Sequence, residues 1–214
     1  MNKILIALAM GLTALPAFAS SGVQLEKVQV DTSKAALERG MDIVTSNCTG
    51  CHSLKYIHYR NLLSMGIDKK KVDTLRGDKS MDATLTSAMD EEAAKQSFGT
   101  VPPDLSLMFN AREGRGNYTY SYLIGFYKKP DGSLDNHVFP GVKMPDVMGI
   151  SEAADEKARA DIKAQAKDVV SFLAWTADPH EQDRLNFGKY LMGYLVVLTG
   201  LLYLLKKRIW AKLK

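Results

Sequence analysis

The chain has 214 residues, of which 28 are basic and 24 are acidic, giving a formal net charge of +4. The excess lies at the ends, because all 24 acidic residues precede Arg184 while Lys3 and the seven basic residues from Arg184 onward flank them. Residues 20–183 are therefore acidic by about four charges, which excludes a basic nucleic-acid-binding domain and suits a basic soluble partner. A segment of about 165 residues is the size of one domain.

Residues 1–19 have the pattern of a secretory signal peptide. Lys3 is the positive start, Ile4 to Leu15 is an apolar run, and Ala17-Phe18-Ala19 is a small-residue cleavage site. The apolar run is too short for a membrane helix. We expect the mature chain to begin at Ser20, outside the cytoplasm.

The first helix of the domain is predicted to begin at Ser33, a residue type that caps helix N-termini. Leu37, Met41 and Val44 follow at helical spacing and form one apolar face. This helix leads directly into the most informative stretch of the chain.

That stretch is Cys48-Thr49-Gly50-Cys51-His52, which contains the only two cysteines. The C-x-x-C-H pattern is typical of haem c attachment, in which both thiols add to the porphyrin and the histidine binds its iron. A disulfide, a redox dithiol or half of a zinc site are the alternatives. A redox dithiol needs a βαβ setting and zinc needs a second ligand pair, and the sequence indicates neither. The motif therefore predicts one covalently bound haem c on Cys48 and Cys51, with His52 as an iron ligand.

Further along, residues 75–103 and 110–118 mix short helical patterns with loops marked by Gly and Pro, and residues 120–127 predict one more short helix. Strand patterns are poor throughout. A mainly α domain with long irregular segments is expected, as needed to wrap one flat cofactor.

The sixth iron ligand has one favoured candidate, Met144. It lies in a turn-rich loop, residues 139–145, where Pro145 disfavours helix at the residue before it. A thioether also favours reduced iron, as an electron carrier requires. The residues alone leave four alternatives open, namely Met148, Met108, His58 and His137.

The last helix of the domain is predicted over residues 152–177, with an apolar stripe that ends at Leu173 and Ala177. Residues 187–205 then form a nearly uncharged run of about 19 residues, which as a helix would span about 28 Å and cross a bilayer. Residues 206–214 are a basic tail. By the positive-inside rule the tail is cytoplasmic and residues 20–184 lie on the periplasmic side of the bacterial inner membrane.

Four segments in the same order resemble the cytochrome c1 family and cover nearly the whole mature chain. The haem motif is followed by Tyr56, Tyr59 and Arg60. The other three are Pro102-Pro103-Asp104-Leu105-Ser106 with Asn110-Ala111-Arg112 and Tyr118, then Phe139-Pro140-Gly141 with Met144-Pro145, then Ala166 to Trp175 with Asp178-Pro179 and Arg184.

The resemblance implies a class I cytochrome c-like haem domain with one C-terminal transmembrane helix, acting as the haem c subunit of the cytochrome bc1 complex. It implies that His52 and Met144 ligate the iron, that Arg112 pairs with a haem propionate, that Pro103 packs near the ring, and that Tyr118 lies near the propionates. The implied partners are cytochrome b, the Rieske iron–sulfur protein and a soluble or tethered cytochrome c.

The resemblance also implies a task for the chain: it would pass single electrons from the Rieske protein to cytochrome c, as a subunit of quinol–cytochrome c reductase with no bond-making chemistry of its own. The haem motif and anchor alone also fit a membrane-tethered shuttle or the haem c subunit of a terminal oxidase. A haem enzyme or ligand sensor with an open sixth position is a further alternative.

Overall fold

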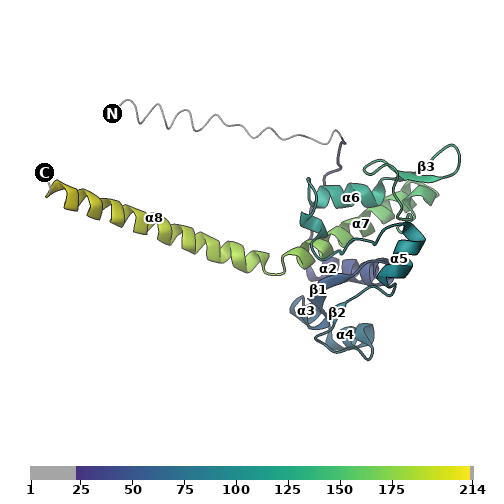
Figure 1. Cartoon of the computed structure of the whole chain (residues 1–214), viewed down its shortest axis with the longest axis horizontal. Coiled ribbons are helices and arrows are strands. Elements are labelled where there is room, and N and C mark those ends of the chain that lie inside the picture. Colours follow the sequence, from purple (N-terminus) through teal and green to yellow (C-terminus); the bar gives the residue numbers. More distant parts are fainter. Residues whose placement is uncertain (1–22, 213–214) are drawn as a thin grey trace.

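The computed structural model describes residues 23–212. The predicted signal peptide and the last two residues of the basic tail lie outside the described residues. The described part is mainly helical, as predicted: a folded body ends with α7, and one long helix, α8, projects away from it (Figure 1).

The helices and strands alternate irregularly along the chain. The helices are α2 (Lys34–Ile43), α3 (Tyr59–Ser64), α4 (Lys69–Arg76), α5 (Glu91–Phe98), α6 (Gly116–Ile124), α7 (Glu156–Ala177) and α8 (Glu181–Ala211). The strands are β1 (Leu54–His58), β2 (Thr84–Leu85), β3 (Phe126–Lys128) and β4 (Leu134–Asn136). They pair as two antiparallel two-stranded sheets, β1 with β2 and β3 with β4.

Helix α2 begins where the sequence predicts, because the Ser33 side chain accepts a hydrogen bond from the backbone N–H of Ala36 at 3.3 Å. Leu37 and Met41 are buried on its inner face. After Ile43 the helix widens into a π-helical turn, Val44–Cys48, which brings the haem motif out of the helix end.

Helix α7 begins at Glu156, four residues later than predicted. The side chain of Asp155 accepts a hydrogen bond from the N–H of Ala158 at 2.7 Å and caps the helix there, while Ile150–Glu152 forms a separate 3-10 turn. Helix α6 also differs from the short helix predicted over residues 120–127. It starts at Gly116, ends at Ile124, and continues into strand β3.

Helices α2 and α7 pack closely where Gly40 faces α7. A Cβ atom built on Gly40 would lie 2.1 Å from the main-chain oxygen of Asp168, so only glycine allows this approach. Beside it, Arg39 makes two hydrogen bonds to the carboxylate of Asp168, at 2.6 and 2.9 Å. The contact fixes the helix that carries the haem motif against the longest helix of the body.

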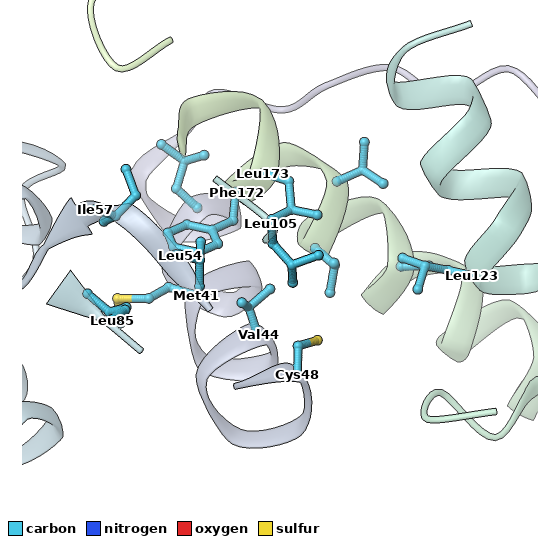
Figure 2. Close-up of a cluster of buried hydrophobic side chains, with 14 of the residues drawn as sticks. Met41, Val44, Cys48, Leu54, Ile57, Leu85, Leu105, Leu123, Phe172 and Leu173 are labelled. Carbon is cyan, nitrogen blue, oxygen red and sulfur yellow. The ribbon is translucent and has the colours of Figure 1, made fainter. Parts of the chain in front are cut away.

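The hydrophobic core lies around this helix pair (Figure 2). Phe172 and Leu173 of α7 and Met41 of α2 are among its buried side chains. Leu54 and Leu85, which are paired partners in β1 and β2, belong to the same cluster, so the first sheet packs on the helices.

Helix α8 is of a different kind. The part Asp183–Ala211 is long and apolar enough to cross a membrane, and the most apolar stretch within it makes no buried contact with the body. It contains the predicted span, residues 187–205. Apolar side chains exposed along such a length are stable in a bilayer and costly in water.

Candidate haem site

The haem motif forms a tight turn at the end of the π-helical segment. The backbone N–H groups of Cys51 and His52 both donate to the carbonyl oxygen of Cys48, at 3.1 and 2.8 Å. Both cysteines are free thiols, Cys48 buried and Cys51 half-buried. In Figure 2 Cys48 lies at the rim of the drawn cluster, on the same coil as Val44. The turn therefore holds two thiols and one imidazole at the edge of the apolar core.

The environment of Cys48 keeps its thiol uncharged. Burial, helped by the neighbouring Cys51, raises the pKa of Cys48 to about 11. Across residues 23–212 no group of three or more His, Cys, Asp or Glu side chains is placed to hold a metal ion. The zinc alternative therefore has no support among the described residues.

His52 is oriented by a single hydrogen bond. Its Nδ1 atom lies 2.7 Å from the main-chain oxygen of Pro103, a contact in which the protonated nitrogen is the donor. Burial lowers the pKa of His52, and the bond to Pro103 partly opposes that shift. A neutral imidazole with its proton on Nδ1 leaves the Nε2 lone pair free to bind a metal.

The proline segment is aligned with the haem motif by its neighbours. The N–H of Leu105 donates to the carbonyl of Ser53 at 2.8 Å, and the N–H of Lys55 donates to the Asp104 carboxylate at 2.8 Å. The Ser106 hydroxyl accepts from the N–H of Tyr56 at 3.1 Å. These contacts hold residues 103–106 alongside residues 53–56 and so hold the Pro103 carbonyl at His52.

Met144 is half-buried and packs against the core. The hydroxyl of Tyr122 lies 3.6 Å from its sulfur, within the range for a hydrogen bond to a thioether. Burial raises the pKa of Tyr122 to about 12, so this hydroxyl keeps its proton near neutral pH and remains a donor. Met144 thus has a polar contact at its sulfur.

The alternative ligands lie in different surroundings. Met108 and Met148 are half-buried against the core, as Met144 is. His137 is exposed and stacks on Tyr127, with ring centroids 4.1 Å apart. The Nδ1 atom of His58 lies within hydrogen-bond distance of the main-chain oxygen of Asp82, at the start of α3.

Tyr118 and Arg112, the two residues expected near the haem propionates, have different surroundings. Tyr118 stacks on Tyr122, with ring centroids 6.4 Å apart, and so adjoins the Met144 contact. Arg112 is exposed, and its guanidinium donates to the carbonyl of the preceding residue, Ala111, at 3.1 Å. Among the contacts of the described residues, none joins Arg112 to another candidate.

Sequence reasoning missed three residues around Met144, namely Tyr122, Asp135 and Asn136. Tyr122 follows Tyr118 by four positions, which places both rings on one face of α6 and was a usable signal. Asp135 and Asn136 sit in strand β4, and no local pattern marks them. Their buried polar side chains hold the loop that precedes Met144, as described below.

The donor set fits a haem c. Imidazole nitrogen and thioether sulfur are the ligand pair of electron-carrying c-type cytochromes, and two free thiols three positions apart provide the covalent attachment. Val44, on the same coil as Cys48, and Tyr122, whose hydroxyl contacts Met144, are apolar or aromatic and suit a flat porphyrin.

Comparison with known proteins shows the family of the chain. The model of the cytochrome C1 family matches residues 24–213. Cytochrome c1 of Allochromatium vinosum is 32% identical over 98% of each chain. The cytochrome b/c1 protein of Bradyrhizobium diazoefficiens is 30% identical over 83% of this chain, which spans only 33% of that longer protein. A chain of a hyperthermophilic respiratory Complex III has the same fold, with a TM-score of 0.55 and 20% identity, over 100% of this chain and 98% of that one.

The family match extends through α8, so the apolar helix belongs to the family pattern and the protein is membrane-anchored. The chain belongs to the cytochrome c1 family, and like the other members it is an electron-transport protein that carries one covalently bound haem c.

Proposed function

We propose that the chain is the haem c subunit of a cytochrome bc1 complex, and that it passes single electrons from the Rieske iron–sulfur protein to a cytochrome c. The observation that carries the proposal is the combination of a C-x-x-C-H turn, whose His52 Nδ1 lies 2.7 Å from the Pro103 carbonyl oxygen, with a C-terminal helix long and apolar enough to cross a membrane. A haem held covalently on an anchored domain stays in place through repeated docking of mobile partners.

The residues of the site would each do one task. Cys48 and Cys51 would hold the haem through thioether bonds, and His52 would bind its iron through Nε2 while Nδ1 stays on the Pro103 carbonyl. Met144 would bind the iron through its sulfur. Arg112 would swing from its contact with Ala111 to pair with a propionate, for which its planar donor fork is suited.

When bound, the haem supplies a one-electron carrier whose potential depends on its ligands and surroundings. The chain's own contribution is to set those surroundings. Tyr122 keeps a proton directed at the Met144 sulfur, and Tyr118 stacks on the Tyr122 ring.

The ligand assignment is tested by replacing Met144 with Leu in the haem-loaded protein, with Met148→Leu as the matched control. We expect M144L to lose the thioether-to-ferric-iron absorption and its reduced form to bind carbon monoxide, because the sixth position opens. M148L should keep the absorption. The opposite pattern would assign the ligand to Met148, and an absorption unchanged in both variants would point to Met108. Ready carbon monoxide binding by the unaltered reduced protein would favour an open-site haem enzyme or sensor.

We infer the orientation from the charges that follow the apolar part of α8. The basic residues after residue 205 would remain in the cytoplasm, and the haem domain would then lie on the periplasmic side of the bacterial inner membrane. The cytochrome b/c1 name of the Bradyrhizobium diazoefficiens relative supports cytochrome b as a partner, and the respiratory Complex III chain supports membership of such an assembly.

The assembly is tested by purifying the full chain from its membrane in mild detergent. Recovery of cytochrome b and a Rieske protein with it, together with quinol-dependent reduction of cytochrome c, is the expected result. A haem protein recovered alone, or with the subunits of a terminal oxidase, would support the shuttle or oxidase alternative instead.

A further inference from the structure

The two residues that end strand β4 are both polar and both buried, Asp135 with 6% and Asn136 with 0% of its surface exposed. Burying polar side chains is costly unless their hydrogen bonds are made. Three of the six side-chain contacts these two residues make go to the backbone of residues 138–141, the start of the loop that carries Met144.

Asp135 holds the end of this segment, at Gly141. Its Oδ1 atom accepts from the N–H of Gly141 at 2.7 Å and from the N–H of Asn136 at 2.9 Å, and its other oxygen pairs with Lys129 at 2.8 Å. The bond from Lys129, followed by those from the two N–H groups, lowers the pKa of Asp135 to about 2, so the carboxylate is charged near neutral pH. Gly141 has a φ of +78°, which lets the chain turn toward Met144.

Asn136 holds the first residues of the loop, Val138 and Phe139, and joins them to α6. Its side-chain oxygen accepts from the N–H groups of Val138 at 2.8 Å and Phe139 at 3.2 Å. Its side-chain nitrogen donates to the main-chain oxygen of Tyr122 at 2.8 Å. Tyr122 is the residue whose hydroxyl contacts the Met144 sulfur. One asparagine thus links the backbone behind Tyr122 to the loop that presents Met144.

The space around Asn136 is tight. A Cβ atom built on Gly125 would lie 3.2 Å from the Asn136 side-chain oxygen and 2.6 Å from the main-chain oxygen of Ser121. The backbone N–H of His137 also donates to the carbonyl of Gly125 at 3.0 Å. The side chain of Asn136 is therefore enclosed by its neighbours, which restricts its position relative to the loop.

We propose that Asp135 and Asn136 are positioning residues, which together fix the loop of residues 138–148 so that Met144 is presented to the haem iron. The inference rests on the proposed ligation by Met144. A thioether on an unheld loop would leave the iron for part of the time, because ordering a loop costs conformational entropy. Three hydrogen bonds from these two side chains to the loop backbone, with three further contacts that fix the side chains themselves, offset part of that cost before the iron binds.

The chain offers a matched control in the same hairpin. Asp131 lies in the turn between β3 and β4 and accepts two hydrogen bonds from Ser133, at 2.9 and 2.6 Å; among the hydrogen bonds of the described residues, none joins Asp131 to the Met144 loop. A role confined to hairpin stability predicts that Asp131 and Asp135 behave alike. A positioning role predicts that only Asp135 affects the iron.

The test compares D135A, N136A and D131A with M144L, each in the haem-loaded full chain. The readouts are the thioether-to-ferric-iron absorption, carbon monoxide binding by the reduced protein, and the reduction potential. We expect D135A and N136A to lose about half of the absorption or more, as when bound and released loop states become similar in population. They should also gain carbon monoxide binding and have a lower potential. D131A should match the unaltered protein.

D135N adds a conservative rescue, because its amide oxygen can still accept from the N–H of Gly141. It should recover most of the absorption that D135A loses, and it decides the question if N136A fails to accumulate. Full absorption in both D135A and N136A, with loss only in M144L, would overturn the positioning role alone. Equal losses in D131A and D135A would also overturn it. An unchanged absorption in M144L would overturn the ligand assignment, and this proposal with it.

Discussion

The Nδ1 atom of His52 lies 2.7 Å from the main-chain oxygen of Pro103, across 51 positions of sequence. The acceptor belongs to the backbone, so the side chain of Pro103 is not needed for the bond. Its ring instead restricts the backbone that presents the carbonyl. A substitution of Pro103 can therefore remove the effect of its ring on the backbone while keeping the hydrogen bond to His52.

Replacing Pro103 by Ala should keep His52 on the iron and leave the haem absorption unchanged. The unfolded chain gains freedom, so we expect a loss of about 0.4–1 kcal/mol in the free energy of unfolding. Denaturant unfolding and the absorption spectrum measure the two effects. A changed ligand spectrum would mean that the Pro103 ring itself contacts the haem, as the family resemblance implies.

Replacing Tyr122 by Phe removes only the hydroxyl near the Met144 sulfur. A hydrogen bond to sulfur weakens its donation to ferric iron, so its loss should lower the reduction potential. A weak bond of ~0.5–1 kcal/mol corresponds to about 20–40 mV for one electron. Redox titration measures the shift, and Tyr127→Phe, at a ring that stacks on His137, is the control. A higher potential in Y122F would contradict the contact.

Replacing Gly40 by Ala should be strongly destabilising, because the new Cβ would lie 2.1 Å from a backbone oxygen that cannot rotate away. We expect a loss near or above ~3 kcal/mol, the upper end for overpacking. Ala35→Ser on the exposed face of the same helix is the control and should change stability by less than about 0.5 kcal/mol. Equal thermal unfolding of the two variants would contradict the close packing of α2 on α7.

These predictions rest on features that the sequence revealed to different degrees. The first helix was predicted from Ser33 and from the spacing of Leu37 and Met41, because capping and helical periodicity are local. The haem motif was equally readable, since its chemistry lies within five residues. The strands could not be predicted in this way, because β1 and β2 contain only five and two residues and pair across a long separation in the sequence.

The surroundings of Met144 show why the rest of the site could not be read in advance. Asn136 bonds the backbone of Tyr122, and Asp135 bonds that of Gly141; such contacts depend on the folded path of the chain and on no residue pattern. Asp155 caps α7 by the same local rule as Ser33, although the sequence pattern predicted the start of this helix at residue 152.

The stability of the protein should depend on pH through Asp135. Its pKa is lowered from an ordinary 3.8 to about 2, chiefly by Lys129, so the folded state binds this proton more weakly than the unfolded chain does. The carboxylate's contribution is therefore complete above about pH 4 and is lost as pH falls toward 2. The difference in Tm between the unaltered protein and D135N should be constant above that window and shrink within it. A difference that grows on acidification would contradict the assignment.

The central claim is that this haem domain takes its electron from an iron–sulfur protein and passes it on. The most direct measurement is stopped-flow reduction of its haem by quinol in the detergent-purified complex, before and after removal of the iron–sulfur subunit and again after its return. The account predicts that fast haem reduction disappears with that subunit, returns with it, and is followed by oxidation when cytochrome c is added. Haem reduction at an unchanged rate without the iron–sulfur subunit would contradict it.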